Sequence, residues 1–214
     1  MIRSARSIKA LLQALRSDRA GATIVEFALV APALLIVLLG GLDFSYRAYV
    51  HSLLQGSLND AARRASVESP DMGGDKSVKI EDRVKEIVKG STDRVAPSGT
   101  LVVTQKNYFD FSGIGNPEKI VKDVGGDGSY DEDDGDCFED LNDNGTFDID
   151  AGRTGRGAAN DVVFYNATLT MDALLPIRSF IGGEDKYVLR ATTAVRNQPW
   201  QEQAKPPVIC GGVK

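Results

Sequence analysis

The residues with the clearest metal-binding chemistry lie in an acidic segment, residues 127–150. That segment holds eleven of the 30 acidic residues of the chain and no Lys or Arg. Within it, oxygen-bearing side chains recur at alternate positions and a Gly occupies the sixth position, as in the first nine residues of an EF-hand-type calcium loop. The pattern predicts calcium as a ligand. The predicted calcium-binding residues are Asp140, Asn142, Asn144, Thr146 through its backbone carbonyl, and Asp148.

The twelfth position departs from the calcium-loop pattern, because Ala151 stands where a bidentate Glu normally completes the coordination shell. Asp150, Asp143 or Glu139 would have to supply the missing oxygen. The sequence predicts no helix on either side of the loop. Two interpretations therefore stand together: a calcium site of the millimolar, extracellular kind, and a solvated acidic loop whose Asn-Gly turn reverses the chain.

Patterns typical of enzymes are sparse. The single histidine, His51, cannot build a histidine-based triad or a multi-histidine metal site. The glycines Gly152, Gly155 and Gly157 follow the acidic segment instead of joining a strand to a helix, so they do not form a phosphate-binding loop. A net charge of −5 without a clustered basic stripe argues against nucleic acid as a partner. We expect a protein that is not an enzyme, and a metal-dependent hydrolase ranks last among the alternatives.

The N-terminal region has the composition of a membrane anchor. Five basic residues and one acidic residue occupy positions 1–19, and the 21-residue run 22–42 that follows contains Glu26 as its only charge. A helix of that length spans roughly 30 Å, the thickness of a bilayer core. The basic leader predicts a cytoplasmic N-terminus and an extracytoplasmic C-terminus. The run is longer than that of a secretory signal peptide, and no small-x-small site follows it, which disfavours a cleaved and released protein.

Glu26 requires its own explanation, because a charge within a membrane segment costs about 3 kcal/mol at the bilayer centre. It could simply reach the cytoplasmic headgroups from the end of the helix. However, the sequence from Asp18 to Phe27, with Gly21 followed by Ala22 and then Glu26, resembles a prepilin processing site. The resemblance implies peptidase cleavage between Gly21 and Ala22. It also implies that Glu26, the fifth mature residue, pairs with the free α-amino group of a neighbouring subunit.

More narrowly, residues 19–35 resemble the TadE-like pseudopilins of the tight-adherence (Flp) pilus system, a type IV pilus system. The sequences Gly40-Gly-Leu-Asp-Phe and Asn59-Asp-Ala-Ala-Arg, and the run 188–200, share this resemblance. It implies a pseudopilin or minor pilin of the bacterial inner membrane, with a periplasmic C-terminal domain, that enters the extracellular pilus or supports its assembly. The implied partners are a prepilin peptidase, other pilins or pseudopilins, and the pilus assembly machinery. The alternative function is a membrane-tethered calcium-binding or adhesive module.

The hydrophobic pattern predicts an α+β fold of the pilin kind. The apolar helix of residues 22–42 should continue as an amphipathic helix over 43–70, giving one rod over 23–68, before an extracytoplasmic domain over 71–214. A second helix is predicted from residue 80 to Gly90, and strands over 101–108, 163–171 and 187–196. Each strand has one apolar face, so an antiparallel sheet should pack on the rod. Residues 1–21 form the predicted basic leader, and the proline-containing tail after residue 197 is expected to be irregular.

The two cysteines of the chain, Cys137 and Cys210, should share an oxidising compartment if the domain is extracytoplasmic. We therefore expect one disulfide that closes a loop of 73 residues. The apolar residues of the segment 174–181 are expected to cover an end of the sheet or to contact a partner.

Overall fold

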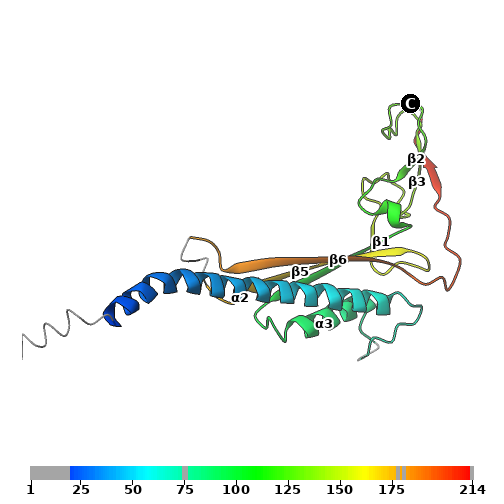
Figure 1. Ribbon diagram of the computed structural model, residues 1–214. Helices are drawn as coiled ribbons and strands as arrows, with labels where there is room; N and C mark the ends of the chain where they lie inside the picture. The colour runs from blue at the N-terminus through cyan, green and yellow to red at the C-terminus, as the bar shows by residue number, and fades with distance from the viewer. Residues whose placement is uncertain (1–19, 74–76, 177–178, 180–181, 213–214) are drawn as a thin grey trace, which may run out of the picture.

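The structure is a computed structural model that describes residues 20–73, 77–176, 179 and 182–212 (Figure 1). The predicted basic leader lies outside the described residues except for Ala20 and Gly21. The helices are α2 (Ala20–Ala65), α3 (Ile80–Thr92) and the 3-10 helix η1 (Phe111–Gly113). The strands are β1 (Thr100–Tyr108), β2 (Lys119–Lys122), β3 (Cys137–Glu139), β4 (Arg153–Thr154), β5 (Val162–Asp172), β6 (Lys186–Arg196) and β7 (Val208–Cys210).

Helix α2 is the predicted rod, with 46 residues and a length of about 69 Å. Its first half projects beyond the sheet and its second half packs along it (Figure 1). The rod was expected to continue to residue 68, but it ends at Ala65. The reason is local: the backbone N–H and the hydroxyl of Ser66 both donate to the carbonyl of Arg63 and close a turn there. Helix α3 extends two residues past Gly90, to Thr92, whose hydroxyl donates to the carbonyl of Val88.

The main sheet is antiparallel, with the strand order β4-β1-β5-β6. Strands β5 and β6 pair over their full length, from Val162 opposite Arg196 to Asp172 opposite Lys186. Strand β1 pairs with β5 along all of its residues, from Thr100 opposite Thr170 to Tyr108 opposite Val162. The three strands predicted from alternation are thus the three long strands of the sheet, and the α+β fold class is confirmed.

The core lies between the inner face of this sheet and the second half of α2, with α3 alongside. Alternate residues of β5 and β6 point inward and are almost fully buried, which is the pattern of a sheet with one covered face. Burial raises the pKa of Tyr165, at the centre of β5, to about 12. The buried apolar residues are Val50, Leu54, Leu58, Ala61, Ala62, Ala65, Val84, Val88, Ala96, Leu101, Val163, Tyr165, Ala167, Leu169, Met171, Tyr187, Leu189 and Ala191.

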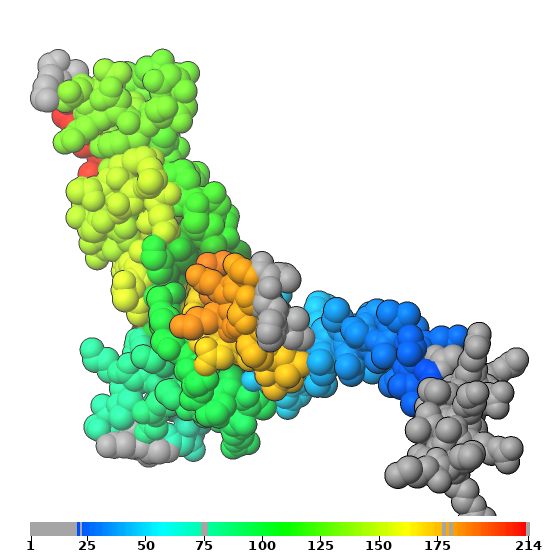
Figure 2. Space-filling model, turned by 90° about the vertical axis from the view of Figure 1, so that its left-hand side faces the viewer, coloured from blue at the N-terminus to red at the C-terminus, as the bar shows by residue number. Residues whose placement is uncertain are grey.

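A second, smaller body stands at the end of the main sheet far from the N-terminal half of α2 (Figures 1 and 2). We call it the distal lobe, residues 109–152 and 203–212. Its sheet has the order β2-β3-β7, so the tail that was expected to be irregular contributes strand β7. The segment of Gly152, Gly155 and Gly157 that follows the acidic segment contains β4, the edge strand of the main sheet. These strands have two to four residues each, and their pairing depends on partners distant in sequence, which explains why local alternation did not reveal them.

Substitution in the core should cost far more stability than substitution on the outer face of the sheet. Leu58, a residue of α2, is fully buried in the core. Leu58→Ala should lower the free energy of unfolding by about 2 to 5 kcal/mol, because it leaves a cavity in a packed interior. The measurement is urea unfolding of the full chain in mild detergent, followed by fluorescence of the single tryptophan, Trp200. Val102→Ala, on the half-exposed outer face of the sheet, is the control and should change stability by about 0.5 kcal/mol or less. Equal losses in the two variants would contradict this assignment of the core.

Candidate functional sites in the apolar helix and the distal lobe

The predicted cleavage bond, between Gly21 and Ala22, lies in the first turn of α2. Gly21 and Glu26 are both exposed, and a Cβ on Gly21 would meet no atom within 4 Å. The first four N–H groups of a helix have no partner within the helix, so this turn opens at little cost in hydrogen bonds. The structure therefore presents the bond in an accessible turn. No other part of the described chain packs against Gly21.

The first half of α2 exposes apolar side chains around its whole circumference. Within the described residues, α2 is the one helix long and apolar enough to cross a membrane, and its most apolar window is unburied. A helix that is apolar all round needs an apolar surrounding, either lipid or other apolar helices. The exposed large apolar residues of this half are Ile24, Val25, Phe27, Leu29, Val30, Leu34, Leu35, Ile36, Val37, Leu38, Leu39 and Leu42.

The apolar half of α2 is joined to the domain by a buried carboxylate, Asp43. The hydroxyl of Tyr187, in β6, donates to Asp43 Oδ2, and the backbone N–H of Leu174 donates to Oδ1 at 3.1 Å. The guanidinium of Arg47 lies over the ring of Tyr187, 5.0 Å from its centroid. Asp43 directly follows the apolar run 22–42, and sequence reasoning missed these partners. They lie more than 130 residues away along the chain, so no local pattern could have identified them.

The predicted calcium loop adopts a turn in which buried Asp140 accepts backbone hydrogen bonds. Its Oδ1 accepts from the N–H of Asn144 at 3.2 Å and its Oδ2 from the N–H of Gly145 at 2.8 Å. Gly145 has a φ of +80°, a conformation that favours glycine. The sharp turn that the pattern predicted at the sixth position is therefore present. These two hydrogen bonds hold the carboxylate against the turn.

The other predicted ligands converge on one carboxylate oxygen. The side-chain amides of Asn142 and Asn144 both donate to Asp148 Oδ2, each at 2.6 Å. Thr146 donates its backbone N–H and its hydroxyl to Asn144 Oδ1. The residues are thus brought together. For both asparagines to present oxygen to a cation beside Asp148, the two side-chain amides would have to turn over, which is a rotation about one bond.

The candidate residues for completing a coordination shell are engaged elsewhere or exposed. Lys106 Nζ lies 2.6 Å from Asp150 Oδ2, and this hydrogen bond holds the pKa of Asp150 below its usual range. Lys119 Nζ lies 3.6 Å from Glu139 Oε1. Asp143 is exposed on the turn, with a φ of +59°. Among the described residues, no group of three or more His, Cys, Asp or Glu side chains is arranged to hold a metal ion. The predicted set contains two carboxylates and relies on amide and carbonyl oxygens for the rest.

Glu118, outside the acidic segment, ties the two ends of this loop together and was missed by sequence reasoning. Its Oε1 accepts from the N–H of Leu141 at 2.8 Å, and its Oε2 from the N–H of Asp148 at 3.0 Å. Burial raises the pKa of Glu118, and the nearby charge of Asp140 acts in the same direction against the backbone donors. The contacts span 23 and 30 residues, so the sequence carried no local signal for this role.

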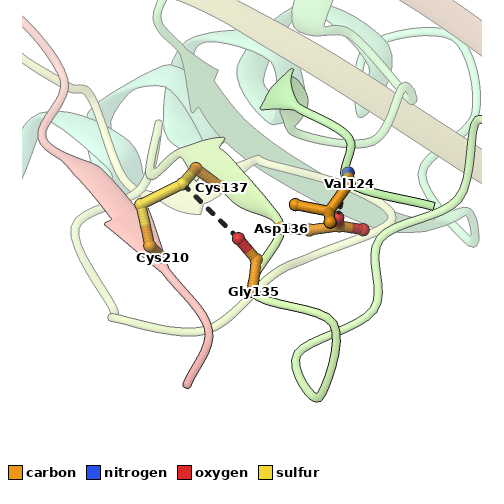
Figure 3. Close-up of a disulfide and its surroundings, with 5 residues drawn as sticks. All are labelled: Val124, Gly135, Asp136, Cys137 and Cys210. Carbon is orange, nitrogen blue, oxygen red and sulfur yellow. Dashed lines mark hydrogen bonds between the residues drawn. A yellow bond between two sulfur atoms is a disulfide. The ribbon is translucent and has the colours of Figure 1, made fainter. Parts of the chain in front are cut away.

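The tail is fastened to the distal lobe by a disulfide between Cys137 and Cys210 (Figure 3). The two residues lie opposite each other in the β3–β7 pair, with Cα atoms 4.0 Å apart. A Cβ on Gly211, the next residue, would come within 2.1 Å of the backbone oxygen of Glu132. The tail therefore packs so closely on the acidic segment that only glycine fits at this position.

Beside the disulfide, the carboxylate of Asp136 organises the acidic segment. Its Oδ1 accepts from the N–H of Val124 at 2.7 Å, a contact visible in Figure 3, and its Oδ2 from the N–H of Asp131 at 2.9 Å. These donors hold the pKa of Asp136 below its usual range. Asp123 in the same way accepts from Gly128 at 2.8 Å. Several carboxylates of the lobe thus serve as acceptors for loop backbone groups.

His51, the single histidine, faces the sheet edge. Its Nε2 lies 3.1 Å from the carbonyl oxygen of Arg190, in β6. Four residues later, the side-chain amide of Gln55 donates to the carbonyl of Thr192 at 3.0 Å. The two side chains fasten α2 to the outer edge of β6. The role of His51 in the structure is therefore to hold α2 against β6.

Comparison with known proteins gives one match. Residues 21–63 match the family model of TadE, described as TadE-like protein. The match begins at Gly21 and covers most of α2, so the chain carries a TadE-like segment and the resemblance is confirmed over residues 21–63. The run 188–200 lies outside the match, and its resemblance stays a prediction. No curated protein and no solved structure is significantly similar to the chain.

Asp136 predicts a specific pH dependence for the distal lobe. Because its pKa is depressed in the folded state, its contribution to stability is complete above the unfolded pKa of about 3.9 and is lost as the pH falls through the lower folded value. Asp136→Asn removes this contribution, so the difference in stability between wild type and variant should shrink as the pH is lowered from about 5 to below 3. The measurement is the hydrogen exchange of the backbone amides of Val124 and Asp131.

Asp143→Asn, at an exposed carboxylate of the same lobe, is the matched control and should leave the exchange of both amides unchanged. A difference between wild type and Asp136→Asn that stays constant across this pH range would show that the charge of Asp136 contributes nothing to the lobe.

Proposed function

We propose that the protein is a pseudopilin or minor pilin that supports assembly of a tight-adherence pilus and is processed by a prepilin peptidase. The observation that carries the proposal is that the TadE-like match begins at Gly21 and covers the helix whose first half is apolar and unburied. Beyond this segment the domain is an antiparallel sheet packed on the same helix. Such a protein works through contacts with other subunits, not through catalysis.

The proposed location is the bacterial inner membrane, crossed once, with the N-terminus in the cytoplasm and the domain in the periplasm. The support is the basic leader before the apolar half of α2, together with the length of that half, which matches a bilayer core. A disulfide in the distal lobe fits an oxidising compartment outside the cytoplasm. The same helix could afterwards exchange lipid for the apolar helices of neighbouring subunits.

Processing is proposed at the bond between Gly21 and Ala22. A peptidase must take the scissile bond as extended backbone, so it must first open the first turn of α2. This turn is exposed and weakly bonded, and Gly21 has no Cβ to obstruct close approach. After cleavage Glu26 lies one turn from the new N-terminus, where a negative charge suits the helix dipole. The charge can then pair with the α-amino group of a neighbouring subunit when apolar helices bundle.

Gly21→Val and Glu26→Ala should separate the two roles. Gly21→Val should leave the 21-residue leader attached, because the β-branched side chain obstructs the peptidase. Glu26→Ala should be cleaved normally and yet fail to support pilus assembly, because the charge partner is gone. The measurement is mass spectrometry of the N-terminal peptide from the membrane fraction, combined with a pilus count by microscopy.

The structure makes Gly21→Val a clean variant, since a Cβ at this position meets open space and cannot disturb the packing of the chain. Gly40→Val, in the same apolar half and also open around its Cβ, is the matched control and should be processed normally. An intact leader on the wild-type protein, in a host that processes other prepilins, would refute the proposal and leave a plain single-pass anchor.

A second candidate function is calcium binding by the loop of residues 140–148, in a membrane-tethered module. The observation that favours it is the pose of Asp140, whose carboxylate is buried and oriented by the N–H groups of Asn144 and Gly145 at the glycine turn. Asn142, Asn144 and Asp148 gather their side chains beside it. A cation there would replace the amide donors that now contact Asp148 and would relieve the charge crowding of the acidic segment.

Millimolar calcium should raise the melting temperature of the domain, and Asp140→Ala combined with Asp148→Ala should abolish that rise. The measurement is thermal unfolding of the full chain in detergent, with magnesium as the ionic-strength control. Asp71→Ala combined with Glu202→Ala removes the same charge outside the loop and should keep the rise. If calcium and magnesium act alike on the wild type, the loop is merely acidic.

A further inference from the structure

A groove of about 390 Å³ runs between α2 and the edge strand β6, close to the point where the apolar half of α2 meets the domain. In Figure 1 the orange strand β6 runs beside α2 and begins near the point from which the first half of α2 projects beyond the sheet. One wall is a single face of α2, because its residues are spaced by three and four. The lining residues are Phe44, Arg47, Ala48 and His51 from α2, and Val188, Leu189 and Arg190 from β6.

The end of the groove at Phe44 and Arg47 lies at the height of a membrane surface if α2 crosses a bilayer as proposed above. The exposed apolar run of α2 ends at Leu42, two residues before Phe44. At 1.5 Å per residue, Phe44 lies about 3 Å and Arg47 about 8 Å beyond that end. The headgroup region of one leaflet is roughly 5 to 8 Å thick. Phe44 and Arg47 therefore fall within it.

The chemistry of the lining is apolar and basic, in a protein with a net charge of −5. Phe44 is 70% exposed and Val188 is 50% exposed, and each offers apolar surface to the solvent. Arg47 and Arg190 are exposed, and neither is in an ion pair within the described part of the chain. None of the described lining residues is acidic. The groove is thus a small cationic site with apolar walls.

The groove is preformed because its two walls are locked together. Asp43 accepts hydrogen bonds from Tyr187 and Leu174 at the membrane end, and His51 contacts the carbonyl of Arg190 at the other end. Arg47 lies over the ring of Tyr187, which orients its guanidinium while leaving N–H donors at the edge of that group. A ligand would therefore not have to pay for assembling the site.

We propose that this groove binds an anionic phospholipid of the leaflet that faces the domain. Arg47 and Arg190 contact the phosphate and its anionic headgroup, while Phe44 and Val188 pack against the glycerol and the upper acyl chain. The inference rests on the proposed membrane anchoring. It adds a specific lipid site that would set the tilt and the height of the domain above the membrane.

A lipid fits this surface better than an added peptide strand does. The outward carbonyls of Arg190 and Thr192 already contact His51 and Gln55 of α2, so this stretch of the β6 edge is closed to strand pairing. A phospholipid needs no backbone hydrogen bonds. It needs cations beside an apolar surface at the membrane boundary, which is what the groove supplies.

The test uses the full chain in vesicles of phosphatidylcholine that contain a trace of spin-labelled phosphatidylglycerol or spin-labelled phosphatidylcholine. Electron paramagnetic resonance measures the association constant of each labelled lipid with the protein. In the wild type, phosphatidylglycerol should associate more strongly than phosphatidylcholine. Arg47→Gln combined with Arg190→Gln should lower its association roughly 25-fold, because each arginine near an anionic lipid contributes about a fivefold effect and the two effects multiply.

Three variants and one additive complete the design. Arg47→Lys combined with Arg190→Lys keeps the charge and should retain most of the preference. Lys119→Gln combined with Lys122→Gln, on the exposed face of β2 in the distal lobe, should leave the preference unchanged. Phe44→Ser should weaken the association of both labelled lipids. Millimolar inorganic phosphate should not displace phosphatidylglycerol, since displacement would identify a phosphate site and overturn the lipid assignment.

Equal association of the two lipids with the wild type, or an unchanged preference in the double glutamine variant of well-folded protein, would overturn the proposal. Folding is checked by the melting temperature, since Arg47 also contacts Tyr187. Failure of the proposed function is distinguishable, because it would appear as a chain that does not float with the vesicles or as an uncleaved leader in cells. Neither of these results depends on the groove.

Discussion

The packing of the second half of α2 on the inner face of the main sheet is the contact on which the rest of the structure depends. One continuous helix must be apolar all round in its first half, which projects from the domain. In its second half, which packs on the sheet, it must be apolar on one face. The small residues Ala61, Ala62 and Ala65 allow its last turns to approach the sheet and α3 closely. Because the helix is shared, the position of the anchor relative to the domain is set by the core itself. The buried carboxylate of Asp43 fastens the junction between the two halves.

The distal lobe is held by different means, because its short strands enclose little apolar volume. Phe138 and Phe147 pack with Tyr130, whose ring stacks on Phe147 at 4.7 Å between centroids, and this is the small apolar centre of the lobe. Around it, the carboxylates of Asp136, Asp140 and Glu118 accept the backbone N–H groups that short strands and loops leave unpaired. Much of the acidity of this segment is therefore structural, and the disulfide ties the chain terminus to it.

The helix, the main sheet and the distal lobe thus have separate structural roles. The first half of α2 is long and apolar enough to cross a membrane, and the packing of its second half on the sheet holds it rigidly to the domain. The lobe, carried at the end of the sheet far from the apolar half of α2 (Figure 1), presents an acidic surface at a distance from it. The TadE-like match is confined to residues 21–63, in the helix, and does not extend to the lobe.

By itself, the sequence determined the features that depend on local periodicity and on composition: the rod, its apolar half, the second helix, the three long strands and the α+β class. The sequence also showed the spacing of Gly21 and Glu26 and the alternation of oxygen-bearing side chains from Asp140 to Asp148, because each pattern spans fewer than ten residues. Only the tertiary structure decided the sheet β2-β3-β7, the pairing of Asp43 with Tyr187 and the role of Glu118. These contacts join residues 30 to 144 positions apart or involve strands of a few residues. These contacts stabilise the fold through residues that are distant in sequence, so a short window of sequence does not contain both partners.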